Sequence, residues 1–429
     1  VGSAQRMKEV AKLITDGERK IVVLSAMSGT TNTLVEISDY LYKKNPEGAN
    51  EIINKLEAKY KQHVDELYAT EEYKQKGLEI IKSHFDYIRS YTKDLFTLFE
   101  EKVVLAQGEL ISTAMVNYYL QECGVKSVLL PALEYMRTDK NAEPDPIYIK
   151  DKLQAQLELY PDAEIYITQG FICRNAYGEI DNLQRGGSDY TASLIGAAIR
   201  ASEIQIWTDI DGMHNNDPRI VDKTAPVRQL HFEEAAELAY FGAKILHPTC
   251  IQPAKYANIP VRLLNTMDPL APGTLISNDT EKGKIKAVAA KDNITAIKIK
   301  SSRMLLAHGF LRKVFEIFES YQTSIDMICT SEVGVSVSVD NTKHLNEILD
   351  DLKKYGTVTV DKDMCIICVV GDLEWENVGF EAKALDAMRD IPVRMISFGG
   401  SNYNISFLIR ECDKKVALQS LSDMLFNGK

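Results

Sequence analysis

Strand-like runs alternate with helical patterns through roughly the first 280 residues. Ile21–Ala26 is a continuous apolar run, and further strand candidates are Ser127–Pro131, Glu164–Phe171, Glu203–Ile210 and Ile259–Asn265. A continuous apolar run is typical of a parallel strand that is buried on both faces. The alternation therefore predicts an α/β fold with an open, mostly parallel sheet and helices on both of its faces.

One long stretch between the first two strand candidates has only helical periodicity. Apolar residues recur at helical spacing from Ile52 to Leu67 and again from Leu78 to Leu98. We expect residues 48–102 to form a helical lobe that packs against the α/β core.

The pattern changes after the turn-rich stretch Asp268–Asp279. Two successive copies of strand, helix, strand, strand and helix follow it. This repeat predicts two small α+β modules, which resemble ferredoxin-like modules in their order of elements. We expect a first domain over residues 1–283, one module over 284–361 and another over 362–429.

Composition excludes several classes of function. The chain has 50 basic and 61 acidic residues, a net charge of −11, which disfavours nucleic acid or an anionic membrane as the main partner. No apolar run approaches the length of a membrane span. Seven scattered cysteines without a disulfide framework fit a reducing cytoplasm.

Common catalytic and metal-binding motifs are missing. The sequence has no P-loop, no dinucleotide-binding glycine motif and no protein-kinase signature. Cys365-Ile-Ile-Cys368 has zinc-like spacing but no second pair, and it lies in a predicted strand, so core cysteines are the better interpretation. We expect no protein-bound metal site.

Glycine-containing loops at strand ends are the remaining candidates, since ligands bind there in open α/β sheets. Ser25–Thr31 follows the first strand, and its small residues would let the backbone approach an anion, although an ordinary strand-to-helix turn explains it equally well. Gln184–Tyr190 also precedes a helix. Its Arg185 is suited to bind a carboxylate through two hydrogen bonds, and packing does not explain the pattern.

Three further motifs carry charged residues in predicted loops or helix starts. Glu109 is expected to open a helix, where it would either complement the helix dipole or hold an ammonium group. Thr208 and Asp209 end a strand and could meet a nucleotide, with Arg219 near its phosphates. Lys244 lies two residues after a glycine and is either a functional lysine or a solvated lysine of a helix.

Together these motifs carry a resemblance to a known family. The segments SAMSGTTN, QGE, TQGFI, QRGGSDYTA, WTDIDG followed by DPR, and FGAKILHP occur in this order. The chain resembles the aspartate kinases of the amino-acid-kinase superfamily, including their tandem ACT modules, over essentially its whole length. Kinases of glutamate, N-acetylglutamate and uridylate share the fold but not this loop set with a doubled ACT tail.

The resemblance implies transfer of the ATP γ-phosphate to the side-chain carboxylate of L-aspartate, the first step of lysine, threonine and methionine biosynthesis. It implies Mg²⁺ held mainly by phosphates. Substrate residues carried over by position are Ser25, Thr31, Glu109, Arg185 and Ser188. Residues carried over for ATP are Thr208, Asp209, His214, Arg219, Lys244 and Ile245, with His214 standing where relatives often have Tyr.

Charge assigns the roles within this set. Arg185 suits the α-carboxylate of aspartate and Glu109 its α-ammonium group. Asp189 matches a family residue that orients a catalytic lysine. Relatives carry that lysine in a K-F-G-G loop directly before the segment that matches Val1–Ala4, and we expect the native protein to have it as well.

The tail resembles that of the lysine-sensitive members. The residues carried over for a lysine site are Met304, Ala307, Phe310, Leu311, Ser324, Asp326, Ser331 and Glu332. Asp326 and Glu332 suit a cationic amino acid, whereas Ala307 and Leu306 depart from the common residues, so threonine or no effector remain alternatives. The resemblance also implies a homodimer through the ACT modules, or a tetramer.

Two other functions are compatible with the residues. One is a catalytically silent sensor that binds an amino acid through its ACT modules. The other is the same kinase chemistry on glutamate.

Overall fold

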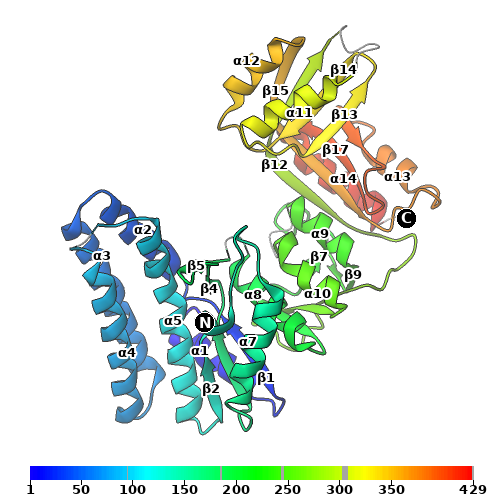
Figure 1. Cartoon of the computed structure of the whole chain (residues 1–429). Helices are drawn as coiled ribbons and strands as arrows, with labels where there is room; N and C mark the ends of the chain where they lie inside the picture. Colours follow the sequence, from blue (N-terminus) through cyan, green and yellow to red (C-terminus); the bar gives the residue numbers. More distant parts are fainter. Residues whose placement is uncertain (94, 184–185, 243–245, 302–307, 428–429) are drawn as a thin grey trace. The chain divides into compact units, whose positions relative to one another are not determined.

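The computed structural model describes residues 1–93, 95–183, 186–242, 246–301 and 308–427 (Figure 1). The chain divides into two units. Unit 1 comprises Val1–Trp207, Thr249–Arg262 and Thr266–Leu270. Unit 2 comprises Thr208–Pro248, Leu263–Asn265 and Ala271–Lys429.

A parallel three-stranded sheet lies at the centre of unit 1. Its order is β1 (Lys20–Leu24), β3 (Ile165–Gln169) and β2 (Ser127–Leu130). The middle strand β3 is buried at every position, as expected for a strand covered on both faces. Because the strands are parallel, their carboxyl ends lie at the same edge of the sheet, with Leu24 opposite Gln169.

Helices of unit 1 connect these strands, and a short hairpin follows β3. The hairpin strands are β4 (Ile172–Arg174) and β5 (Ile180–Asn182). The helices outside the lobe are α1 (Ala4–Ile14), α2 (Thr30–Tyr42), α5 (Leu98–Glu122), α6 (Ala132–Tyr135), α7 (Pro146–Glu158), α8 (Gly187–Ile199) and α10 (Gln252–Ala257).

The lobe residues form two long antiparallel helices, α3 (Pro46–Leu67) and α4 (Glu71–Ser90), which pack beside α2 and α5 (Figure 1). The apolar pattern misleads near its end, because α4 stops at Ser90 and Leu95 is 76% exposed. The prediction that Glu109 opens a helix is wrong. A capping box of Thr97 and Glu100 starts α5 at Leu98, so Glu109 lies in the helix interior.

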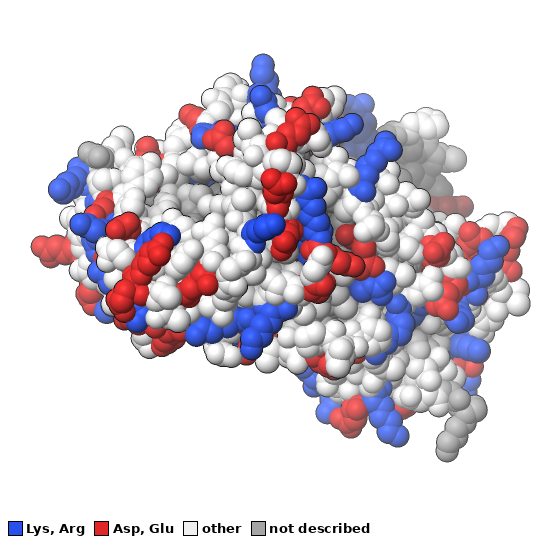
Figure 2. All heavy atoms as spheres, turned by 90° about the horizontal axis from the view of Figure 1, so that it is seen from below, with Lys and Arg blue, Asp and Glu red and all other residues white. Residues whose placement is uncertain are grey.

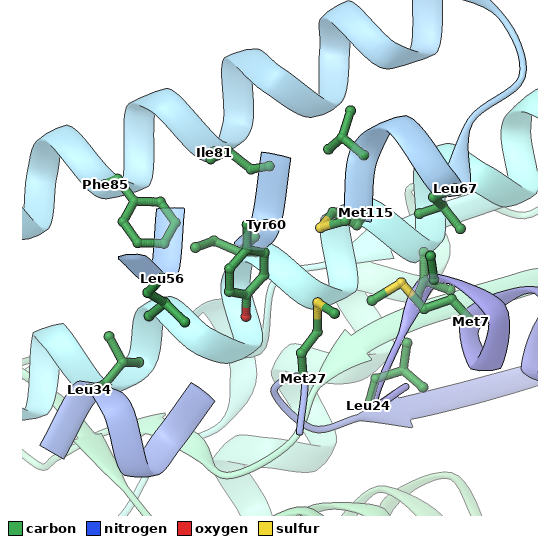
Figure 3. Packing of buried hydrophobic residues seen from close by; sticks show 14 of the residues in the cluster. Met7, Leu24, Met27, Leu34, Leu56, Tyr60, Leu67, Ile81, Phe85 and Met115 are labelled. Carbon is green, nitrogen blue, oxygen red and sulfur yellow. The ribbon is translucent and has the colours of Figure 1, made fainter. Parts of the chain in front are cut away.

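Apolar side chains from the sheet, the lobe and α5 share one core. Figure 3 shows Met27, Tyr60, Phe85 and Met115 packed together, and each is at most 2% exposed. Burying a side chain of this size contributes about 1.5–3 kcal/mol. The lobe is therefore fixed to the first strand and its loop by packing.

A second sheet follows along the chain. Its order is β6 (Ile204–Thr208), β10 (Val261–Asn265), β11 (Thr274–Ser277) and β9 (Gln229–His231). The chain also forms the hairpin β7 (Met213–His214) with β8 (Pro226–Val227), the helix α9 (Phe232–Tyr240) and the short 3-10 helix η1 (Pro248–Ile251).

In the part of the tail that the structure describes, one antiparallel six-stranded sheet packs with four α-helices. Its strand order is β13 (Met327–Ser331), β14 (Gly334–Val339), β12 (Ile285–Lys300), β15 (Thr357–Gly371), β17 (Asn404–Arg410) and β16 (Val393–Ser397). The helices are α11 (Phe310–Ser320), α12 (Leu345–Lys353), α13 (Phe380–Ala387) and α14 (Lys414–Leu425), preceded by the 3-10 helix η3 (Glu411–Asp413).

Two α+β modules share the long central strands of this sheet. Residues 295–300 of β12 pair with β14 and with residues 357–361 of β15. Residues 285–291 of β12 pair with residues 366–371 of the same β15, whose other edge pairs with β17. The second module therefore takes its fourth strand from residues 285–291, which lie inside the range 284–361 expected for the first module. Strand β15 also continues across the expected boundary at 361/362.

Each module has its own hydrophobic core, one around Phe310 and Ile348 and the other around Phe380 and Leu418. Cys365 and Cys368 are both fully buried in β15, as the interpretation of core cysteines predicted.

Candidate active site

The carboxyl ends of β1 and β3 are joined directly. The amide of Gly170, which follows β3, donates to the carbonyl of Leu24 over 2.9 Å. The loop from Ser25 to Gly29 and the turn at Gly170 therefore start from one point of the sheet edge. This is where the sequence places its glycine-containing loops.

The first turn of α8 packs against that edge. A Cβ atom at Gly170 would lie 2.7 Å from the Cα atom of Ser188, so only glycine permits this approach. The amide of Phe171 donates to Thr191 Oγ1 over 3.1 Å, which fixes the helix from the other side. Ser188 and Asp189 are thereby held in the first turn of α8, next to the end of β3.

Two helices begin close to this edge with glycine as the N-cap residue. α2 begins after Gly29 and α8 after Gly186. A glycine cap has no side chain that could accept from the N–H groups of the first turn. Helix starts of this kind favour an anionic ligand.

Helix α5 covers the loop after β1. Its Ser112 Oγ donates to the carbonyl of Ser25 over 2.8 Å. A Cβ atom at Gly108 would lie 2.9 Å from Ala26 Cβ and 3.3 Å from Thr30 Cγ2, so the loop packs closely against this glycine. The next residue of the helix, Glu109, is directed toward the same loop.

Glu109 is a buried carboxylate without a cation partner among the described residues. It is 3% exposed, and its Oε1 accepts from the amide of Ala26 over 3.2 Å. Its Oε2 is buried and has no hydrogen-bond partner in the described part of the chain. Burial raises the pKa of Glu109 to about 7, although the Ala26 N–H opposes this shift. An ammonium group would satisfy the open oxygen and stabilise the charge.

Asp189 is a second carboxylate near the sheet edge, and it is partly buried in the first turn of α8. Burial raises its pKa to about 6. A carboxylate with a raised pKa gains from a nearby cation, so Asp189 is suited to orient a cationic side chain or ligand. Thr31, at the start of α2, is half-buried, whereas Ser25 is exposed.

Five predicted site residues lie outside the described residues. They are Arg185, Lys244, Ile245, Met304 and Ala307.

The predicted nucleotide residues that the structure describes lie in unit 2. Thr208 ends β6, and its hydroxyl contacts the amide and carbonyl of Ile210 within 3.3 Å. In the hairpin of β7 and β8, His214 Nδ1 lies 3.0 Å from Thr224 Oγ1. Asp209 directly follows β6 and is exposed.

Arg219 is exposed and forms an ion pair with Asp217 of the same DPR segment. Its guanidinium donates to both carboxylate oxygens of Asp217, at 2.9 and 2.7 Å, and this pairing lowers the pKa of Asp217. To bind a phosphate, Arg219 would have to loosen or share this ion pair.

The predicted effector residues fall into two separate places. Asp326 directly precedes β13, while Ser331 ends that strand and Glu332 follows it. At 3.2–3.4 Å per residue, roughly 20 Å separate Asp326 from Glu332. Within one chain these two carboxylates cannot meet one small ligand. Phe310 is buried at the start of α11, whereas Leu311 and Ser324 are exposed.

The side chain of Asp326 is buried within a polar cluster whose other members are partly exposed. Its Oδ1 accepts from Lys291 Nζ over 2.6 Å and from the Tyr240 hydroxyl over 3.0 Å. Lys291 also pairs with Asp340 over 2.9 Å and lies 4.5 Å from the centre of the Tyr240 ring. Asp326 Oδ2 is buried without a hydrogen-bond partner among the described residues, and burial raises the pKa of Asp326. The carboxylates of Asp326 and Asp340 share the single ammonium group of Lys291, so the cluster has a net negative charge that a second cation could balance.

Sequence reasoning missed several contributors to these sites. Ala26 contributes only its backbone amide, which no side-chain motif reveals. Lys291 and Tyr240 lie in a strand and a helix whose patterns indicate only regular structure, so their meeting with Asp326 depends on tertiary folding. The sequence does indicate Gly170, because this glycine lies in the TQGF segment at the end of a predicted strand.

Neither a metal site nor a membrane span is found in the part of the chain that the structure describes. No group of three His, Cys, Asp or Glu side chains there could hold a metal ion. No helix in the same ranges is long and apolar enough to cross a bilayer.

Family comparisons agree with this arrangement. Residues 2–265 match the Amino acid kinase family, and residues 367–425 match the ACT domain. The chain is 35% identical to aspartokinase 1, chloroplastic, of Arabidopsis thaliana, over 100% of this chain and 79% of that protein. It is 32% identical to lysine-sensitive aspartokinase 3 of Escherichia coli, over 96% of this chain and 94% of that protein.

Solved structures of E. coli aspartokinase III have the same fold. The structure in complex with aspartate and ADP has a TM-score of 0.84 at 30% identity and covers 99% of this chain and 97% of that chain. The structure in complex with lysine and aspartate has a TM-score of 0.81 at 31% identity, with the same coverage.

Replacing Glu109 by Gln should stabilise the protein at pH 8 but not at pH 5. A carboxyl group whose pKa is raised by folding stabilises the fold below its unfolded pKa and loses this contribution as the pH rises through about 7. We expect Glu109→Gln to raise the free energy of unfolding at pH 8 by up to about 3 kcal/mol, measured by urea denaturation. The exposed Glu164→Gln is the control. An equal increase in the free energy of unfolding at both pH values would contradict the interpretation that Glu109 carries a buried charge at pH 8.

Proposed function

Because this chain belongs to the aspartokinase family, we propose that it transfers the γ-phosphate of ATP to the side-chain carboxylate of L-aspartate, giving 4-phosphoaspartate. The observation that carries the proposal is the buried, unpaired oxygen of Glu109 beside the loop after β1. A buried carboxylate is costly unless a cation meets it, and the α-ammonium group of aspartate is such a cation.

The remaining substrate roles follow from charge and position. Arg185 is proposed to bind the α-carboxylate, and the hydroxyls of Ser25, Thr31 and Ser188 to orient the molecule. This proposal draws support from Ser188 lying in the first turn of α8, close to the end of β3. The residues proposed for ATP are Thr208, Asp209, His214, Arg219, Lys244 and Ile245.

The proposed reaction needs no general base. An oxygen of the ionised side-chain carboxylate attacks the γ-phosphorus, and the bond from that phosphorus to the bridging oxygen breaks as ADP leaves. The protein must align two anions and offset their repulsion, which positioning and cationic groups accomplish. Mg²⁺ on the phosphates would supply further positive charge, held by phosphate and water rather than by a protein cage. Asp189 would orient the lysine that relatives carry in their K-F-G-G loop.

Feedback control by lysine is the proposed regulation. The cluster at Asp326 has two carboxylates for one ammonium group, with one buried oxygen open, which favours a cationic ligand. The E. coli relative that is lysine-sensitive and the lysine complex of E. coli aspartokinase III support the same assignment.

A homodimer through the ACT modules is proposed as the working assembly, with a tetramer built from such dimers as the alternative. Because one strand length separates Asp326 from Glu332, both carboxylates reach one effector only if a second copy contributes one of them.

The proposed setting is the cytoplasm. All seven cysteines lie in the described ranges, and none forms a disulfide. On the face shown in Figure 2, acidic and basic side chains are interspersed, so we propose no nucleic-acid partner for that face.

The full-length protein should phosphorylate aspartate in a hydroxamate assay and should use glutamate far less. Arg185→Ala should raise KM for aspartate at least tenfold and leave KM for ATP nearly unchanged, because a lost charge-assisted hydrogen bond weakens only one substrate. Turnover with glutamate at the aspartate rate would favour the glutamate kinase. Absence of turnover with both amino acids would favour the silent sensor.

The affinity for aspartate should depend on the ionisation of Glu109. As the pH falls from 8 to 6, protonation of a carboxyl group with a pKa of about 7 removes the charge that attracts the ammonium group, so KM for aspartate should rise. Glu109→Gln should have a high KM at both pH values. If KM of the Glu109→Gln variant has the same values and pH dependence as KM of the wild type, Glu109 does not bind the substrate.

Asp326→Asn should weaken inhibition by lysine at least tenfold, because the effector loses its carboxylate partner. Turnover without lysine should change little. Asp361→Asn breaks the ion pair with Arg394 in the same sheet and serves as the control. Unchanged inhibition of the Asp326→Asn protein would reject the effector assignment.

A further inference from the structure

The helical lobe contacts the first residue of α2, directly after the loop that follows β1, through one buried hydrogen bond. The hydroxyl of Tyr60, in the middle of α3, lies 2.8 Å from Thr30 Oγ1. Both residues are 1% exposed, so water does not compete for this contact. Lys59, the preceding residue of α3, donates to the carbonyl of Ser28 over 3.3 Å. Consecutive residues of the lobe therefore hold both ends of the Ser28–Thr30 segment.

Thr30 is held between the lobe and α5. On one side its hydroxyl meets Tyr60, and on the other its methyl group faces the space above Gly108. Figure 3 shows the Tyr60 ring packed with Leu56 and Phe85, with its hydroxyl directed away from Phe85. The ring cannot move without disturbing this core.

The same hydroxyl lies within the electrostatic range of Glu109. Burial raises the pKa of Tyr60, and the negative charge of Glu109 raises it further, whereas the hydrogen bond to Thr30 lowers it. Tyr60 is thus close to both the loop and the carboxylate to which the proposed function assigns aspartate.

We propose that Tyr60 is a positioning residue for aspartate: its hydroxyl fixes Thr30, and through Thr30 it sets the loop that presents Ser25 and the start of α2 that presents Thr31. This inference rests on the proposed function, because the loop and Glu109 are assigned to aspartate there. It gives the helical lobe a role in substrate binding, beyond its contribution to the core.

Losing the hydroxyl affects geometry more than packing. Phenylalanine fills the same core volume, but it leaves the buried Thr30 hydroxyl without its partner. The start of α2 must then shift, or the threonine side chain must turn, to find another hydrogen-bond partner. Aspartate binding depends on this start, while the proposed ATP residues lie on other elements.

The test compares Tyr60→Phe with a matched variant in the full-length protein. Tyr68 is also buried in the lobe core, and its hydroxyl donates to the carbonyl of Met115 on α5, away from the loop. Tyr60→Phe should raise KM for aspartate about fivefold to tenfold, the effect of losing one buried hydrogen bond, with kcat and KM for ATP changed less than about twofold. Tyr68→Phe should lower the melting temperature comparably and leave KM for aspartate unchanged.

A second variant keeps the test decisive if Tyr60→Phe folds poorly. Thr30→Val removes the other hydroxyl at nearly equal volume and should raise KM for aspartate to the same extent. The double variant should be no worse than either single one, because both remove one interaction. Additive effects would overturn the proposal.

The outcomes separate this inference from the proposed function. If Glu109→Gln raises KM for aspartate but Tyr60→Phe behaves like Tyr68→Phe, Tyr60 is only a core residue and the inference is rejected. If Glu109→Gln leaves KM for aspartate unchanged, the assigned site itself is wrong, and the role of Tyr60 is rejected with it.

Discussion

The candidate site of unit 1 is centred on one unfavourable group, the buried carboxylate of Glu109. It lies in the interior of a long helix, accepts one backbone hydrogen bond from Ala26, and keeps its second oxygen unpaired within the described chain. Burial raises its pKa to about 7, so ionisation near neutral pH costs folding energy. A ligand with an ammonium group would offset this cost, which is why the substrate site is proposed at the loops around Glu109.

Parallel strands and close backbone contacts explain how this charge meets the rest of the site. The ends of β1 and β3 share a hydrogen bond, and the glycines at 108 and 170 let α5 and α8 approach the loops that follow. The side chains on these elements come from distant parts of the sequence. Their convergence follows from sheet topology and from two positions where no Cβ fits.

The sequence predicts the parts of this structure that depend on local pattern. Apolar runs located β1, β2 and β3, and the strand-end glycines indicated loops that lie at the carboxyl ends of β1 and β3. The positions at which helices begin and end were harder to predict from the sequence. Glu109 was expected at a helix start, because the capping box at Thr97 is ten residues from the motif and has no apolar signal of its own. The apolar pattern also cannot show that the Tyr60 hydroxyl reaches Thr30. Tyr60 has the spacing of any core residue of a helix, and its contact with Thr30 depends on how α3 packs.

The shared sheet of the tail shows a further limit of local reasoning. A repeat of strand, helix, strand, strand and helix indicates two modules, yet the fourth strand of the second module is the first half of β12, which precedes both helices of the first module. Consecutive order does not reveal this exchange, because residues 285–291 carry the same apolar character as any central strand. The exchange has a mechanical consequence. Both modules hydrogen-bond to β12 and β15, and Lys291, which pairs with Asp326, lies where β12 passes from one module to the other. A ligand that competes for Asp326 would therefore act on a strand that belongs to both modules at once.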